Sequence, residues 1–66
     1  MSVLKVIEVL SDSRVSWEDA AQQAIAKASG SVHNIRSIYI KDHSAKVDQG
    51  KITEYRINAQ VTFELD

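Results

Sequence analysis

The chain has 66 residues, a formal net charge of −1 and no cysteine. A domain of this size buries only about 60% of the surface that its unfolded form exposes, so disulfides, a bound metal or a partner subunit usually stabilise it. The sequence has no cysteine and no cluster of metal-ligating residues. We therefore expect a homo-oligomer. Its eight Lys and Arg are spread along the chain, which excludes a basic stripe for nucleic acid, and we expect a single domain over residues 1–66.

Residues 3–10, VLKVIEVL, are predicted to form the first strand. Apart from Lys5 and Glu8 they are apolar at both odd and even positions, a pattern typical of a strand covered on both sides for part of its length. The segment has neither the basic start and continuous apolar run of a signal peptide nor the length of a membrane span. With no disulfides to suggest secretion, we expect a cytoplasmic protein without a membrane partner.

A helix is predicted to begin after Ser16, which has the side chain of an N-cap and is followed three residues later by Asp19 in the capping-box position. Gly30 is the expected stop. The apolar stripe of this helix is narrow and mostly alanine, with Trp17 as its one large anchor. Such a helix can lie close against a sheet, and we expect Trp17 to pack in the core.

The chain from Asn34 to Val47 is predicted to be a second strand and that from Lys51 to Glu64 a third, with a hairpin turn between them. A two-residue turn at Gln49–Gly50 places Ile38 opposite Val61, and Ile40 opposite Ala59. A three-residue turn would place Tyr39 opposite Ala59 and turn both isoleucines outward. We favour the first register because apolar side chains then face each other, and we allow for a bulge near Ala45.

This register predicts a polar sheet face that the single helix does not cover. The face carries two rows of side chains, from Ser37, Tyr39, Lys41 and His43 and from Thr62, Gln60, Asn58 and Arg56. It meets either water or another subunit. Arg56 is expected opposite His43 and about 20 Å along the strand from Ser37, so one small ligand touching both positions requires a pocket between subunits.

The sequence contains few residues that could support catalysis. His33 and His43 are the only histidines, cysteine is absent, and Gly30 and Gly50 form no phosphate-binding loop. Three acids near the hairpin, Asp42, Asp48 and Glu54, do not resemble the shaped loop that supplies calcium with six to eight oxygen ligands. We therefore expect a protein that is not an enzyme, and we expect no metal site.

The order of the predicted elements and their amino-acid sequences resemble those of the dodecin family over nearly the whole chain. The residues that carry the resemblance are LKVIEVL at 4–10, SWEDAAQQAIAKAS at 16–29, VHNIR at 32–36 and GKITEYRINAQVTFEL at 50–65. The resemblance implies an α+β fold of order β-α-β-β, with a three-stranded antiparallel sheet wrapped around one helix. It also implies a homododecameric shell that stores flavin (riboflavin or FMN) between subunits without turnover.

The family's flavin site is altered in this sequence. In flavin-binding dodecins a Trp on the second strand stacks on the flavin ring, and its position is occupied here by Ser37. A Gln that hydrogen-bonds the ring edge is replaced by Arg56, which only donates. Tyr39 lies two residues beyond Ser37 on the same strand face and can offer another aromatic platform. The predicted ligand-binding residues are therefore Ser37, Tyr39 and Arg56.

Three alternatives remain open at this stage. The shell can have lost flavin and serve a structural role, or bind an ion or another metabolite. Tyr39 can pack in a contact between subunits while Arg56 pairs across an interface with an acid such as Glu54 or Asp42, since Tyr and Arg are common interface anchors. Finally, the chain can be a monomeric or dimeric interaction module, if the resemblance misleads.

Overall fold

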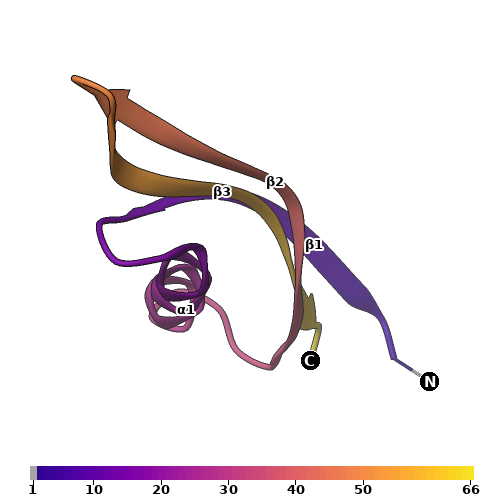
Figure 1. Ribbon diagram of the computed structural model, residues 1–66. Coiled ribbons are helices and arrows are strands. Elements are labelled where there is room, and N and C mark those ends of the chain that lie inside the picture. The colour runs from indigo at the N-terminus through magenta and orange to yellow at the C-terminus, as the bar shows by residue number, and fades with distance from the viewer. Residues whose placement is uncertain (1) are drawn as a thin grey trace.

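The computed structural model describes residues 2–66 and contains a curved sheet around a helix (Figure 1). Strand β1 (Leu4–Ser13) is followed by helix α1 (Trp17–Ala28), and β2 (Ile35–Asp48) and β3 (Lys51–Glu64) complete the chain. The strands are antiparallel in the order β1-β3-β2, so β3 is central. The predicted β-α-β-β fold with a three-stranded antiparallel sheet is confirmed.

The start of α1 is fixed by its cap. Ser16 has an extended backbone, and its Oγ accepts a hydrogen bond of 2.9 Å from the N–H of Asp19, as the sequence predicts. Glu18 and Asp19 add negative charge to the first turn, where the helix dipole favours it. The helix ends at Ala28 and is capped by Ser29, and the N–H of Gly30 donates to the carbonyl of Lys27 at 3.1 Å.

The core lies between α1 and the face of β3 that the helix covers. Ile57, Ala59, Val61 and Phe63 alternate along β3 as buried residues, and Ala20 and Ala24 meet them from the helix. Alanine at the contact allows the helix to approach the sheet closely. Trp17 packs against this core as a partly buried residue at the beginning of the helix, in agreement with the prediction.

The β2–β3 hairpin turns at Gln49 and Gly50, whose φ angles are 50° and 76°. Ile38 lies opposite Val61 and Ile40 opposite Ala59, so the favoured register is confirmed at these pairs. The bulge allowed for near Ala45 is present as a register shift between Lys46 and Val47. A second shift, which the sequence did not indicate, lies between Ile40 and Asp42.

The stretch between these two shifts differs from the prediction. Ser44 lies opposite Arg56, and His43 lies opposite the buried Ile57. His43 is therefore on the face that α1 covers, and its predicted place beside Arg56 on the other face is wrong. The extra residue Lys41 shifts the pairing by one position, and a shift of one residue exchanges the two faces of a strand.

Candidate ligand-binding face

The outer face of the sheet, the face turned away from α1, carries a polar central row. The row comes from the β3 residues that alternate with the buried core: Arg56, Asn58, Gln60 and Thr62. β2 places one side chain opposite each of these, in the order Ser44, Asp42, Tyr39 and Ser37. The outer face therefore gathers all three residues predicted to bind a ligand, although Arg56 stands at the other end of the row.

Ser37 and Tyr39 lie side by side on the outer face, opposite Thr62 and Gln60. The Tyr39 side chain is 65% exposed, an unusual state for so large a ring. An exposed phenol beside the Gln60 amide offers a flat apolar surface next to a group that both donates and accepts hydrogen bonds.

Arg56 is held by Asp12 of β1, its direct partner across the strands. Its Nε and one terminal nitrogen donate to the two carboxylate oxygens of Asp12 at 2.7 and 3.0 Å. This bidentate contact lowers the pKa of Asp12, and in return the carboxylate raises the pKa of Arg56. The acid that pairs with Arg56 within the chain is thus Asp12, and the pairing with Glu54 or Asp42 across a subunit interface stays a prediction.

Arg56 also borders a small cavity of about 260 Å³. Asp12, Lys46 and Glu54 line the same cavity, so it contains charges of both signs. Thr62, opposite Ser37, and Arg56 are six residues apart on β3, or about 20 Å at the usual rise. The structure therefore brings Ser37 and Tyr39 together but leaves Arg56 at a second position.

His43 belongs to an aromatic group on the opposite face of the sheet. Its ring meets the Trp17 indole edge-on at a centroid distance of 5.8 Å, and Tyr55 meets the same indole at 4.8 Å. The Trp17 Nε1 donates to the carbonyl of Ser44 at 2.9 Å. These contacts give His43 and Trp17 a structural role at the beginning of α1.

β1 contributes an apolar row to the outer face, and none of its residues is among the predicted ligand-binding residues. Leu4, Val6 and Leu10 point to this face and are 52%, 52% and 69% exposed. The sequence does indicate this row, because residues 3–10 are mostly apolar at both odd and even positions and so present apolar side chains to both faces of the sheet. Within one chain only one side of β1 is covered, so the other side is available to a partner.

Oxygen ligands on the outer face are mostly engaged by cations of the same chain. Glu8 pairs with Lys41, Asp12 with Arg56, Glu54 with Lys46 and Glu64 with Arg36, at 2.7 to 3.9 Å. Asp42 has no such partner within residues 2–66 and lies opposite Asn58, whose enclosed Oδ1 accepts no hydrogen bond there. No group of three or more His, Cys, Asp or Glu in this described part could hold a metal ion.

The helix of the described residues is too short to cross a membrane.

The model of the dodecin family matches residues 3–66. The chain belongs to the dodecin family. The resemblance identified from the sequence is thereby confirmed. A curated relative, calcium dodecin from Mycobacterium tuberculosis, is 44% identical over 66 residues, a match that covers 98% of this chain and 92% of the relative.

Solved dodecin structures share the fold. A Thermus thermophilus dodecin variant superposes with a TM-score of 0.94 at 24% identity, covering 100% of this chain and 98% of that one. Streptomyces davaonensis dodecin gives 0.92 at 22% identity, covering 98% and 96%. The crystal structure of M. tuberculosis calcium dodecin gives 0.83 at 41% identity, covering 98% and 93%, and is described as having a calcium-binding site.

Proposed function

We propose that the chain assembles into a non-enzymatic homododecameric shell that holds a small ligand between subunits, and that this ligand is calcium. The observation that carries the proposal is the 44% identity, over 98% of the chain, to a relative named calcium dodecin. Identity at this level along the whole length favours the same assembly and the same class of ligand.

The distribution of oxygen atoms supports a site shared between subunits. Calcium takes six to eight oxygen ligands, more than one chain brings together within residues 2–66. Asp42 offers an exposed carboxylate without a cation partner in that range, whereas the Oδ1 of the neighbouring Asn58 is enclosed within the chain and is not accessible to an ion. Symmetry-related copies of Asp42, or other oxygen ligands from neighbouring subunits, would complete the coordination.

A calcium titration of the chelator-treated protein by calorimetry tests the proposal. We expect saturable binding at a fixed ratio of calcium to subunit. Asp42→Asn should weaken it about ten-fold or more, because calcium affinity depends on the number of charged ligands. Glu18→Gln removes the same charge from α1 and should leave binding unchanged. A shell of the correct mass that takes up no calcium would contradict the proposal.

The absence of turnover is supported by the surroundings of the histidines. His33 is exposed in the loop before β2, and His43 packs against the Trp17 ring. Neither forms an ion pair with a carboxylate in the described chain that would orient it as a general base. The sequence has no cysteine to act as a nucleophile.

A second candidate ligand, flavin, is favoured by the exposure of Tyr39. The ring is 65% exposed beside Gln60, so a flavin ring could stack on it while the amide pairs with the ring edge. In this reading Ser37 and Tyr39 come from one subunit and Arg56 from another. The Arg56 guanidinium would then divide its donors between Asp12 and the ligand.

A riboflavin titration followed by flavin fluorescence tests this candidate. Strong quenching at a fixed ratio is expected if flavin binds. Tyr39→Ala should weaken binding about five-fold or more, since stacking on an aromatic ring contributes about 1 kcal/mol beyond burial. Tyr39→Phe retains the ring and should bind as the parent does. An intact dodecamer that leaves riboflavin fluorescence unchanged would exclude flavin.

A further inference from the structure

The end of the β2–β3 hairpin extends beyond the three-stranded sheet. β1 makes its last pair at Ser13 and Tyr55, whereas the hairpin continues to the turn at Gln49 and Gly50. Figure 1 shows this end projecting away from α1. We call the segment from residue 46 to residue 54 the ribbon. A two-stranded ribbon is only marginally stable by itself in water, so a partner surface would stabilise it.

The ribbon carries apolar side chains at its far end. Val47 and Ile52 are cross-strand partners, and they are 62% and 51% exposed. Both side chains lie within three residues of the turn, where a soluble monomer normally places polar groups. The pair therefore forms a compact apolar knob that the chain itself leaves uncovered.

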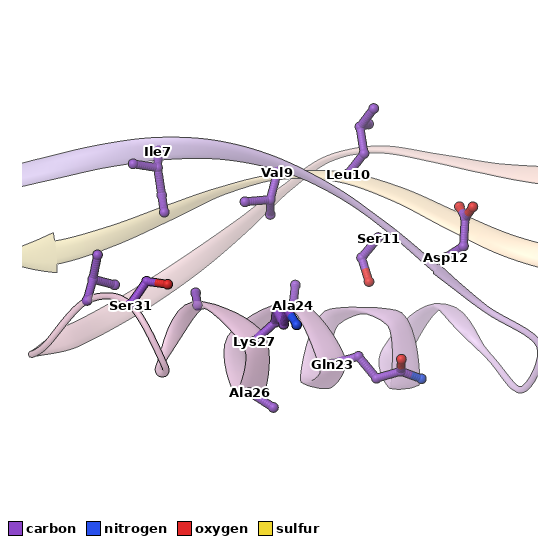
Figure 2. A pocket seen from close by; sticks show the side chains of 12 residues that line it. Ile7, Val9, Leu10, Ser11, Asp12, Gln23, Ala24, Ala26, Lys27 and Ser31 are labelled. Atoms are coloured by element: carbon purple, nitrogen blue, oxygen red, sulfur yellow. The ribbon is translucent and has the colours of Figure 1, made fainter.

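A groove of complementary character runs between α1 and β1. Its volume is about 750 Å³, and its apolar lining includes Ile7, Val9, Ala24, Ala28 and Val32. Figure 2 shows Ile7 and Val9 directed from β1 toward the helix across this space. The groove exists because alanine side chains on the helix are too short to fill the distance to β1. Lys27, from the last turn of α1, also lines it.

The ribbon cannot reach the groove of its own chain. The nearest residue of the groove, Asp12, lies opposite Arg56, four residues or about 13 Å from Ile52 along β3, and Ile7 at its far end is nine residues or about 30 Å away. The occupant of the groove must come from another molecule. A second copy of this chain supplies an apolar knob of suitable size.

The surface area and shape of the chain also favour a second copy. A compact monomer of 7.4 kDa exposes about 4200 Å², whereas this chain exposes 4961 Å². Its radius of gyration is 13.4 Å, against about 10.8 Å for a compact chain of its length. The excess surface corresponds to parts that fold against neighbours.

We infer that the ribbon of one subunit inserts Val47 and Ile52 into the α1–β1 groove of the next subunit. This contact rests on the self-assembly in the proposed function and assigns two surfaces to it. Asp48 at the ribbon end and Lys27 at the groove carry opposite charges and make no ion pair within residues 2–66, so they are available to each other. Because the two surfaces differ, the contact joins subunits head to tail, and a closed shell requires that successive contacts return to the first subunit.

Light scattering on purified variants tests the contact. Ile52→Asp places a charge in the groove and should reduce the mass from that of a dodecamer to that of small species. Gln49→Asp adds the same charge three residues away at the turn, where a φ of 50° tolerates Asp, and should leave the mass unchanged. Circular dichroism of both variants checks that the protomer is folded. An Ile52→Asp protein that stays a dodecamer would overturn the contact.

Disulfide trapping provides an independent test, since the chain has no cysteine of its own. The double variant Ile52→Cys with Val32→Cys should form a ladder of covalently linked subunits under mild oxidation, whereas Ile52→Cys alone should not. An assembled double variant without the ladder would also overturn the contact. A parent protein that is monomeric at all concentrations would instead refute the proposed shell, so the two failures are distinguishable.

Discussion

Ser13 joins the end of β1 to the beginning of α1. It is 4% exposed, and its hydroxyl donates to Asp19 Oδ2 at 2.6 Å while accepting from the Val15 N–H at 2.9 Å. Gln23 donates to the same carboxylate oxygen, and hydrogen bonds from Ser13 and then from Gln23 lower the pKa of Asp19. One buried hydroxyl thus fixes both the loop and the charge of the first helical turn.

Ser13→Ala should lower the free energy of unfolding by about 1–3 kcal/mol, because it removes a buried hydroxyl together with its hydrogen bonds to Asp19 and Val15. Asp19 has a lowered pKa when folded, so its contribution is present above its unfolded pKa and is lost as the pH falls through the folded value. The difference between Ser13→Ala and the parent should therefore shrink below about pH 3.8.

Thermal unfolding at neutral and acid pH measures this difference. Ser29→Ala removes an exposed hydroxyl that donates to the Ile25 carbonyl and serves as the control, with little change expected at either pH. A Ser13→Ala protein as stable as the parent at neutral pH would contradict the assigned role of the hydroxyl.

The helix start shows how far residue-level prediction extends. The Ser16 cap is visible in the sequence because it depends only on local spacing. Asp19 was placed in the capping-box position, but its carboxylate accepts from Ser13 and Gln23. The contact with Ser13 depends on how the loop after β1 bends, and no local pattern encodes that bend.

Among the elements, the β2–β3 hairpin explains why His43 was expected on the wrong face of the sheet. Its register is correct near Ile38 and Ile40 and again at the turn. Between them one extra residue in each strand displaces the pairing, and the two shifts cancel. Alternation of apolar residues reports the net register of a strand but not compensating bulges. The error is therefore confined to the middle of the hairpin, where His43 and Arg56 lie.

The turn of this hairpin predicts opposite effects for two substitutions. Gln49 and Gly50 both have positive φ, as in the two-residue turns that favour Asn followed by Gly. Gln49→Asn should raise the free energy of unfolding by a few tenths of a kcal/mol up to about 1 kcal/mol, and Gly50→Ala should lower it by about 1 kcal/mol.

Urea unfolding of the two variants beside the parent measures both changes. A Cβ at Gly50 would meet no atom within 4 Å, so any loss in Gly50→Ala reports the backbone alone. Equal stability of the two variants would show that the turn adopts another conformation in solution.

At the scale of the molecule, the chain is elongated, with extents of 50 × 20 × 13 Å. Two groups of exposed aliphatic residues lie far apart from each other, one on the outer face of β1 and one at the ribbon end. A single chain cannot bring these regions together, and this is the physical reason that neither the partner surfaces nor a complete ligand site could be read from the sequence. The sequence predicts which side chains leave the core, but not what they meet.

Protein concentration should therefore control stability. If protomers dissociate as they unfold, the unfolding midpoint in urea rises with concentration by mass action. We expect a higher midpoint at each ten-fold increase in concentration, measured by Trp17 fluorescence after full equilibration. A midpoint independent of concentration would indicate that the protomer holds its fold without neighbours.

The two faces of β3 are constrained by different requirements. Ile57, Ala59, Val61 and Phe63 hold the fold, while the side chains between them project to the outer face and contribute little to the core. Exchanging an outer residue therefore changes the surface offered to a ligand or a partner without a large cost in folding. In the course of evolution such a scaffold can acquire a new ligand by a few substitutions at Ser37, Tyr39, Asp42 or Asn58, and members of one family can diverge in their chemistry while their backbones stay superimposable.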